Sequence, residues 1–160
     1  MAKQQAVTNT PGASYPPNLT TDLPHKTIAT RAGLGWIGKC ALLINKHFGA
    51  ALRLGSVLTE APLTTGTPNY MPGCGKCIAC LEACPANAIL GTNWEAGVPR
   101  NSLVDVFRCR EIARDRLIMR IGREVVGRTF CGMCIAVCPW TKDYINQMES
   151  GHGNLLNFRE

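Results

Sequence analysis

The stretch GCGKCIACLEACP, residues 73–85, places four cysteines within eleven positions and a proline directly after the last of them. Its spacing is C-x2-C-x2-C-x3-C-P, the run found in bacterial ferredoxins, in which the fourth cysteine binds the neighbouring cluster. Two-residue gaps let the backbone curl around one cubane, and the proline fixes φ where the chain turns away. The stretch therefore predicts a protein that holds two [4Fe-4S] clusters.

A second, shorter set follows in CGMCIAVCPWTKD, residues 131–143, which also ends in Cys-x-x-x-Cys-Pro and makes an imperfect repeat of the first. It lacks one cysteine of the full run, and Cys109 is the expected substitute. The exchange rule then predicts two ligand sets, Cys74, Cys77, Cys80 and Cys138 for one cluster and Cys84, Cys109, Cys131 and Cys134 for the other. Cys40 remains, and we expect it to be a small buried apolar residue.

Two other uses of the cysteines are open alternatives. Nine cysteines in 160 residues exceed ordinary usage, and in a reducing compartment they indicate metal ligands rather than disulfides. The two C-x2-C pairs have a spacing that also suits structural zinc. A single zinc site would leave Cys80, Cys84 and Cys138 without a role, so the cluster interpretation is favoured.

Composition and charge limit the classes of protein. Hydrophobic residues make up 46% of the chain. No apolar run approaches the ~20 residues of a membrane span, and the N-terminus lacks the apolar segment of a secretory signal. These features predict a cytoplasmic protein with no membrane partner. The formal charge of +6 falls to about +2 once each cluster with four thiolates adds about −2.

The chain divides into four expected segments. Residues 1–24 are rich in proline and small polar residues and predict a flexible leader, and residues 147–160 predict a tail. Residues 25–72 should hold a short helix that stops at Gly33 and a β-hairpin, with strands at 41–44 and 51–59 around a turn. Residues 73–146 should form the double-cluster domain.

One longer helix is expected between the cysteine sets. Apolar residues recur at helical intervals over 103–121, Ser102 and Asp105 resemble a capping box, and Gly122 should end the helix. The predicted fold class is α+β, with a ferredoxin-like two-cluster core, an N-terminal β-hairpin and this helix. Trp140, directly after the second Cys-Pro, is expected to shield a cluster from water.

The same helix is rich in arginine. The window 100–128 holds eight arginines against four acidic residues, which is compatible with a tRNA-facing patch. The alternative is a solvated helix with ion pairs such as Glu111–Arg114 and Arg120–Glu124. Because acids and bases interleave, the solvated helix is favoured.

Several motifs outside the cysteine runs resemble one family. RAGLGWIGKCALLI (31–44), RLGSVLTEAPL (53–63), the cysteine run and CGMCIAVCPWTK (131–142) resemble the C-terminal part of epoxyqueuosine reductases. They are closest to the shorter double-cluster proteins of anaerobes that are similar to these enzymes. Reductive dehalogenases share the same module. The resemblance covers about residues 24–145.

This resemblance implies a function. In that family two [4Fe-4S] clusters relay electrons to a cobalamin, which reduces the epoxide of a tRNA nucleoside. Gly33, Leu34 and Gly35 would then offer backbone towards a corrinoid, although glycines here equally suit a helix stop and turn. The family carries a long region before AGLGWIGK that builds most of the corrinoid pocket, whereas about thirty residues precede the motif here.

The predicted function is therefore electron transfer through two clusters to or from a redox partner protein, with catalytic residues unassigned. The alternative is a corrinoid-dependent reductase, of the epoxyqueuosine reductase type, that works with a separate cobalamin-binding subunit or domain. A zinc-stapled RNA-binding module is a third class, and it would be colourless.

Overall fold

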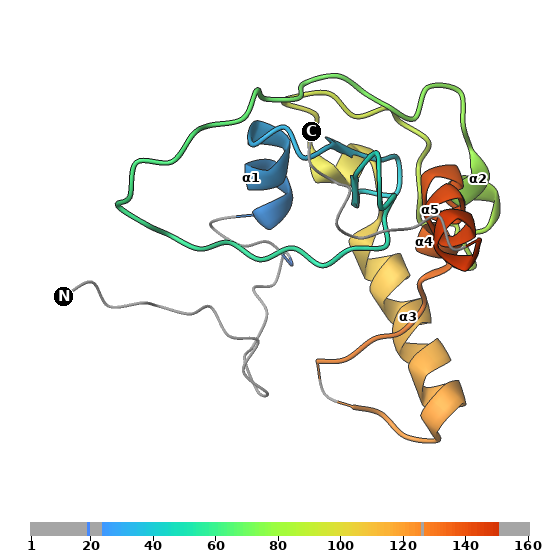
Figure 1. Cartoon of the computed structure of the whole chain (residues 1–160). Helices are drawn as coiled ribbons and strands as arrows, with labels where there is room; N and C mark the ends of the chain where they lie inside the picture. Colours follow the sequence, from blue (N-terminus) through green and yellow to red (C-terminus); the bar gives the residue numbers. More distant parts are fainter. Residues whose placement is uncertain (1–18, 20–23, 126, 151–160) are drawn as a thin grey trace.

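The computed structural model describes residues 19, 24–125 and 127–150. In chain order the elements are α1 (His25–Arg31), β1 (Trp36–Ile37), β2 (Leu43–Ile44), α2 (Ala79–Glu82), the 3₁₀ helix η1 (Arg100–Ser102), α3 (Val106–Ile121), α4 (Met133–Ala136) and α5 (Pro139–Glu149). Helix α3 extends away from the rest of the molecule, and a long loop passes around the side where α1 lies (Figure 1). The fold is a mixture of helices with one small antiparallel sheet, as the α+β prediction required.

The sheet is a tight hairpin. Strands β1 and β2 are antiparallel, with Trp36 opposite Ile44 and Ile37 opposite Leu43. The turn between them is closed by the Gly38 amide, which donates to the Leu42 carbonyl at 2.8 Å. All four strand residues are buried, so this two-residue ladder forms the centre of the core.

The predicted hairpin was wrong in its pairing. Residues 41–44 were expected to pair with 51–59, but β2 pairs with the preceding strand, and residues 51–59 form no strand. The alternation that suggested a strand is real, because Leu52 and Leu54 pack against the core. Farther along, Val57 and Leu58 are 85% and 83% exposed. Among the described residues no strand pairs with the backbone of this segment, so residues 51–59 form an extended loop despite their alternating pattern.

Helix α1 ends as predicted. It stops at Arg31, and Gly33 follows with a φ of +74°. A Cβ at residue 33 would lie 2.4 Å from the Thr67 carbonyl oxygen, so glycine allows the returning loop to pack against the end of α1. The position therefore needs glycine for both its left-handed backbone and its close contact.

Helix α3 begins and ends on capping residues. The Asp105 carboxylate accepts hydrogen bonds from the amides of Phe107 and Arg108, both at 3.1 Å, so Asp105 is the N-cap, and Ser102 lies in η1 instead. Gly122 has a φ of +74° and ends the helix, as predicted. Within α3 only Ala113 is buried, which leaves most of the helix surface in water.

The cysteine repeat has a structural counterpart. Short helices α2 and α4 follow the first cysteines of each set and contact one another. After the first Cys-Pro the chain turns into an irregular segment, whereas Pro139 is the first residue of α5. The two halves of the repeat therefore have the same local structure around the cysteines and different structures after the prolines.

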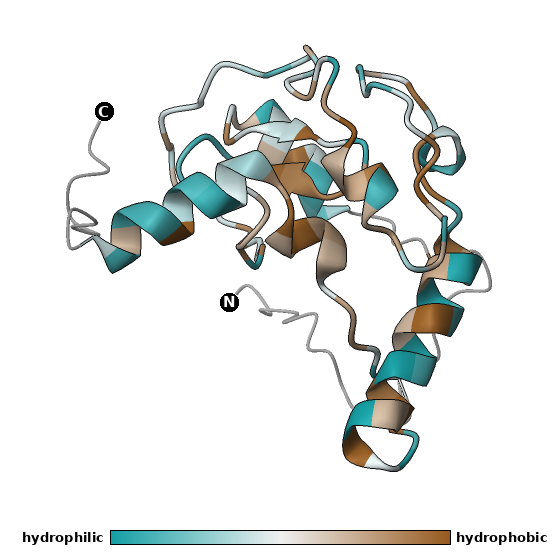
Figure 2. Cartoon of the chain, turned by 90° about the vertical axis from the view of Figure 1, so that its right-hand side faces the viewer, coloured by the Kyte–Doolittle hydropathy of each residue, from teal (hydrophilic) through white to brown (hydrophobic). Residues whose placement is uncertain are grey.

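The apolar residues gather where the hairpin meets the short helices (Figure 2). Buried side chains from the hairpin and from residues 86–89 and 103–104 form one cluster. Within the described residues, no helix has the length and apolar character needed to cross a bilayer. Most of the expected leader (1–24) and the end of the expected tail (147–160) lie outside the described residues, and α5 continues to Glu149.

Candidate metal centre

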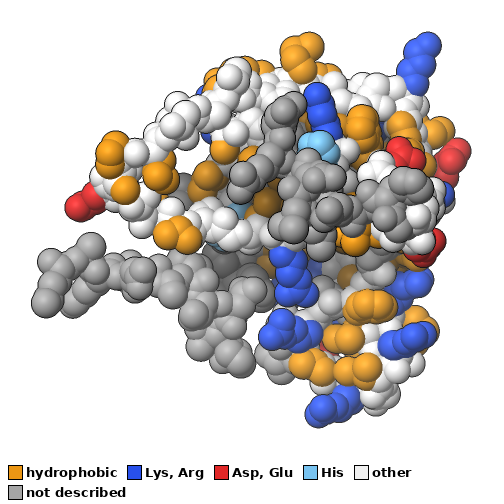
Figure 3. All heavy atoms as spheres, in the orientation of Figure 1, with side chains coloured by type: hydrophobic (Ala, Val, Ile, Leu, Met, Phe, Trp, Pro, Cys, Tyr) orange, Lys and Arg blue, Asp and Glu red, His pale blue; other side chains and the backbone are white. Residues whose placement is uncertain are grey.

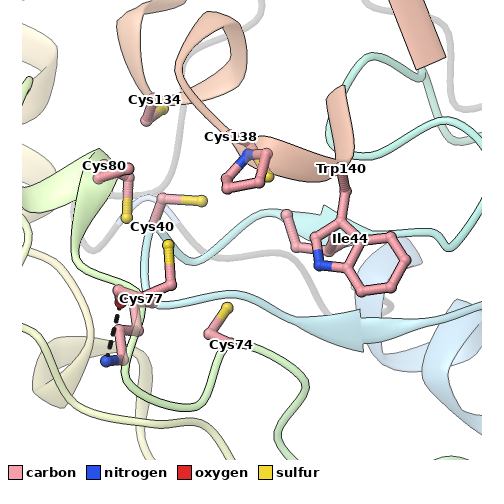
Figure 4. Close-up of a pocket in the computed structure, with 11 residues that line it drawn as sticks. Cys40, Ile44, Cys74, Cys77, Cys80, Cys134, Cys138 and Trp140 are labelled. Carbon is pink, nitrogen blue, oxygen red and sulfur yellow. Dashed lines mark hydrogen bonds between the residues drawn. The ribbon is translucent and has the colours of Figure 1, made fainter. Parts of the chain in front are cut away.

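Six cysteines line one small cavity between the hairpin and the two cysteine loops. They are Cys40, Cys74, Cys77, Cys80, Cys134 and Cys138. The cavity has a volume of about 60 Å³, and its other walls are mostly apolar, with Ile44, Pro139 and Trp140 among them. Figure 4 shows the thiols arriving from separate segments, with Cys40 in their midst. The structure thus brings together all four cysteines predicted for the first cluster, and with them Cys134, which was predicted for the second.

Local backbone structure places these thiols. The Cys77 amide donates to the Cys74 carbonyl at 3.0 Å, which closes a turn within the first loop. Cys80 lies in the first turn of α2, and Cys138 is the N-cap residue of α5. Cys80 and Cys138 are therefore held at the starts of helices, and Cys74 and Cys77 by the turn in the loop before α2.

The cysteines predicted for the second cluster also lie near one another. Electrostatic interactions join Cys109 to Cys84 and Cys131, and join Cys134 to Cys109 and Cys131. Cys109 lies in the first turns of α3, and the Phe130 amide donates to the Ala113 carbonyl of that helix at 2.9 Å. That bond brings the second cysteine loop against α3.

The surroundings of this second group favour sulfur ligands. The Ala88 amide donates to the Cys84 sulfur at 3.4 Å. A bridge between Ile89 and Val104 joins the segment after Cys84 to the start of α3. Amide donors of this kind stabilise negative charge on a thiolate.

The thiols influence one another's pKa values. A hydrogen bond with Cys40 raises the pKa of Cys80, and a hydrogen bond from Cys40 lowers the pKa of Cys134. Burial raises the pKa of Cys109, although one side of this residue is exposed, and the nearby Cys84 and Cys131 raise it further. Because iron binds thiolates, the cysteines of each group must lose their protons when a cluster is bound.

Cys40 was expected to be a small buried apolar residue, and its burial is confirmed at 9% exposure. Its position among the other cysteines was not foreseen. The signal in the sequence was the odd ninth cysteine directly after the AGLGWIGK motif. Sequence reasoning set it aside because it belongs to neither cysteine run.

Lys39 is a second unforeseen residue at the first group. Its side chain is 5% exposed and lines the cavity, and its Nζ donates to the Cys77 carbonyl at 3.0 Å. A buried ammonium beside a thiolate-rich site offsets negative charge. The residue lies within the AGLGWIGK motif that carries the family resemblance.

A second pocket lies beyond a pair of tryptophans. Trp140 lines the cysteine cavity and meets Trp36 edge-to-face, with ring centroids 5.4 Å apart. Trp36 in turn lines an open pocket of about 520 Å³, together with Gly33, Leu34 and Gly35. Ligand pockets commonly range over about 300–1,000 Å³. The residues proposed to face a corrinoid therefore do line a pocket, in addition to forming the turn after α1.

A glycine lets Trp36 reach this position. A Cβ at Gly73 would lie 2.3 Å from Cε2 of the Trp36 ring. Gly73 directly precedes Cys74, so the indole packs against the start of the first cysteine loop. Trp36 thus separates the cysteine cavity from the open pocket.

The arginines of α3 are mostly exposed. Figure 3 shows basic side chains interspersed with apolar ones over the part of the molecule that α3 occupies. The ion pair seen on this helix joins Arg114 to Asp115 at 3.6 Å, not to Glu111 as expected. Phe107 and Met119 are 58% and 77% exposed on the same helix.

The residues fit two iron–sulfur clusters. All nine cysteines are free thiols. Across the described part of the chain, no three His, Cys, Asp or Glu side chains are placed to hold a single metal ion; the thiols of the first group surround a cavity instead. Sulfur donors, amide donors and a largely apolar wall are the environment in which such clusters are held.

Comparison with known families gives the class. Residues 73–141 match the family described as the 4Fe-4S double cluster binding domain. This segment includes eight of the nine cysteines and excludes Cys40. The protein is an iron–sulfur protein with two [4Fe-4S] clusters as its cofactors, and the zinc alternative does not hold.

Similarity to individual proteins is more specific. The epoxyqueuosine reductase of Aliivibrio fischeri is 37% identical over 123 residues, which cover 74% of this chain and 30% of that protein. The enzyme of Synechocystis is 34% identical over 126 residues, 78% of this chain and 42% of its own. This chain is an epoxyqueuosine reductase-like double-cluster protein that spans under half the length of these relatives.

Solved structures agree with this assignment. A crystal structure of selenomethionine-labelled epoxyqueuosine reductase matches with a TM-score of 0.54 and 26% identity, covering 76% of this chain and 31% of that one. The enzyme from Streptococcus thermophilus matches with a TM-score of 0.50 and 27% identity, over 72% of this chain and 30% of its own. The chain is an electron-relay module resembling that of epoxyqueuosine reductase.

Proposed function

We propose that the protein binds its first cluster through Cys74, Cys77, Cys80 and Cys138 and its second through Cys84, Cys109, Cys131 and Cys134. Support comes from the spacing of the cysteines, from the cavity that gathers Cys74, Cys77, Cys80 and Cys138, and from the interactions of Cys109 with Cys84 and Cys131. Cys134 lines the same cavity and also interacts with Cys109 and Cys131, so its place in the second set rests on the spacing. Each set takes thiols from both halves of the chain. When bound, the clusters supply reversible one-electron transfer.

We infer that electrons leave the protein at the open pocket beside Trp36. The observation that carries this is the short succession from the cysteine cavity, through the Trp140–Trp36 contact, to the pocket at residues 33–35. Trp36 is 3% and Trp140 37% exposed, so the two indoles cover part of this side of the first cluster and fix the distance to whatever binds in the pocket. Exclusion of water and fixed spacing are what a relay must supply from its own residues.

The acceptor that fits best is a corrinoid shared with another polypeptide. The pocket is open, and Leu34 at its edge is 53% exposed, so this chain supplies one wall. The relatives are named epoxyqueuosine reductases, and we propose that this protein delivers electrons to such a reductase reaction. The complete reductase, acting on a tRNA nucleoside, is the second candidate.

The electron donor should approach the second cluster. Cys109 is exposed on α3 among basic side chains such as Arg108 and Arg114. A small acidic electron-carrier protein complements this surface, because opposite charges accelerate the encounter of redox partners. Transfer RNA on the same surface is not favoured, since the net charge of the holoprotein is small.

Thiolate ligands also indicate in which cellular compartment the protein works. Clusters on reduced cysteines require an environment that does not form disulfides. We therefore propose that the protein works in the cytoplasm.

Cobalamin titration tests the acceptor site. Protein reconstituted with iron and sulfide without oxygen should bind cobalamin and reduce it when dithionite is added, both seen by absorption. Leu34→Glu places a charge at the pocket edge and should weaken binding, whereas Leu63→Glu, at a residue 70% exposed on the long loop, should not. Equal binding by both variants and the parent, or no binding at all, contradicts the corrinoid proposal but leaves the clusters untouched.

A further inference from the structure

The open pocket beside Trp36 is lined by basic side chains as well as apolar ones. Lys46 and His47 both contribute to its wall. Among the described residues that line this pocket, none is aspartate or glutamate. A cleft lined by charge of one sign attracts ligands of the opposite sign. The pocket therefore favours a ligand that carries a negatively charged group.

The two basic residues lie in a turn that is fixed by hydrogen bonds. The Asn45 Oδ1 accepts from the amides of His47 and Phe48, at 2.8 and 3.2 Å. The backbone closes the same turn, because the amides of Asn45 and Gly49 each donate to the other's carbonyl at 2.9 Å. The backbone that carries Lys46 and His47 is therefore held in one shape.

Asn45 also joins this turn to the segment at residues 33–35. Its Nδ2 donates to the Leu34 carbonyl at 2.7 Å. A Cβ at Gly35 would overlap the carbonyl oxygen of Ile44, so the segment packs closely against the end of β2, directly before the turn. The two basic residues are thereby placed beside the backbone that was proposed to face a corrinoid.

The long loop around α1 supplies another part of the wall (Figure 1). The Asn69 amide donates to the Thr30 carbonyl at 2.8 Å, which ties this loop to α1. Tyr70 lines the pocket, and its hydroxyl accepts a hydrogen bond from Arg31 Nη1 at 3.0 Å. The Arg31 guanidinium lies over the Tyr70 ring, 5.1 Å from its centroid. A third basic side chain is therefore in contact with the lining.

We propose that this pocket recognises a corrinoid by the phosphate of its nucleotide tail, which Lys46 and His47 bind. This inference rests on the proposed corrinoid site and names the part of the ligand that the site recognises. Cobalamin carries a negatively charged phosphodiester between its macrocycle and its base. An ammonium and an imidazole N–H both donate hydrogen bonds to phosphate oxygens. With the tail held at the turn, the macrocycle has the apolar surface of Leu34 and Trp36 to pack against.

Titration of the full, anaerobically reconstituted chain with two corrinoids tests the proposal. Cobinamide lacks the nucleotide tail and its phosphate, whereas cobalamin has both. The parent protein should bind cobalamin about tenfold more tightly than cobinamide, because only cobalamin can accept charge-assisted hydrogen bonds from the turn. Added salt should reduce this difference, since it screens exposed charges.

Substitutions in the turn assign the preference to the phosphate. Lys46→Gln removes the ammonium and should weaken the binding of cobalamin about tenfold while leaving the binding of cobinamide unchanged. His47→Gln should have a smaller effect of the same kind. Lys76→Gln removes an exposed lysine from the first cysteine loop and should change neither affinity. The iron content of each variant shows that its clusters are intact.

The possible results separate this inference from the corrinoid site on which it rests. Equal binding of the two corrinoids by the parent would overturn the phosphate inference and leave the corrinoid site standing. A preference for cobalamin that persists in both Lys46→Gln and His47→Gln would also overturn it, because the base of the tail would then be what is recognised. Absence of binding by either corrinoid would refute the site itself and the inference with it.

Discussion

The two cysteine groups differ in how the rest of the chain encloses them. The hairpin, Lys39 and Trp140 close over the first group and leave a small, mostly apolar cavity. The second group takes Cys109 from a helix whose surface is largely in water and rich in arginine. Two sites that derive from one repeated motif thus meet different surroundings.

This difference indicates a direction of electron flow. Each proposed set has one exposed cysteine, Cys77 in the first and Cys109 in the second. A ligand on an arginine-rich helix suits entry from an acidic partner, whereas a cluster next to a tryptophan pair suits delivery into a pocket. Solvent exposure and nearby charge are also the main means by which a protein sets cluster potentials. Substitutions in one group at a time test this difference.

The largest effect is expected from Cys138→Ser. Cys138 lies next to the second cysteine set in the sequence, yet it lines the cavity of the first. Its loss should remove or alter the cluster on Cys74, Cys77 and Cys80, so that iron falls to about half and one EPR signal disappears. If the signal lost is instead the one lost in Cys131→Ser, the crossover assignment is wrong.

A kinetic difference between the clusters should follow from the hairpin, which packs over the first group and not over the second. With an iron chelator, the unmodified protein should release iron in two phases of about equal size, the faster from the second cluster. The fast phase should be missing in Cys109→Ser. Single-phase release from the unmodified protein would mean that the two sites are equally protected.

The covering of the first group should depend on Thr141. This residue is 1% exposed, and its Oγ1 accepts a hydrogen bond from the Ala50 amide at 2.9 Å, which ties the segment after the hairpin to α5. Thr141→Val leaves that amide unpaired and should lower the free energy of unfolding by about 1–3 kcal/mol. Thermal melting of the anaerobic holoprotein measures this, with Thr64→Val on the exposed loop as the control.

The smallest effect is expected at Lys39. Replacing the buried ammonium in Lys39→Met should lower the potential of the first cluster by on the order of 60 mV, about 1.4 kcal/mol for one electron. Lys76→Met removes an exposed lysine from the same loop and should change the potential less. Equal shifts in the two variants would show that burial of Lys39 has no special effect.

Much of this comparison was predictable from sequence. The cysteine spacing identified the class of cofactor, because cluster ligation is encoded within a dozen neighbouring residues. The end of α1, the position of α3 and the stop at Gly122 were also found, since caps and glycines act locally.

The remaining features depend on contacts between distant segments. The pairing of β1 with β2 was missed because a two-residue strand is too short to show an alternating pattern in the sequence. Leu52 and Leu54 alternate as in a strand because both pack against the core. Cys40 and Lys39 gained their positions only when the hairpin turn met the cysteine loops. The residues next to Cys40 and Lys39 in the sequence do not indicate that these two will face a metal centre.

The bridge between Ile89 and Val104 has one further consequence, for the order in which the holoprotein is assembled. The Leu90 amide donates to the Leu103 carbonyl at 2.9 Å and the Asp105 amide to the Ala88 carbonyl at 2.8 Å beside it, with no cysteine side chain involved. They bring Cys84 and Cys109 together in advance, so part of the chain-closure entropy is already lost when iron arrives. We therefore expect that, during reconstitution with iron and sulfide, the second cluster forms first and the first cluster last.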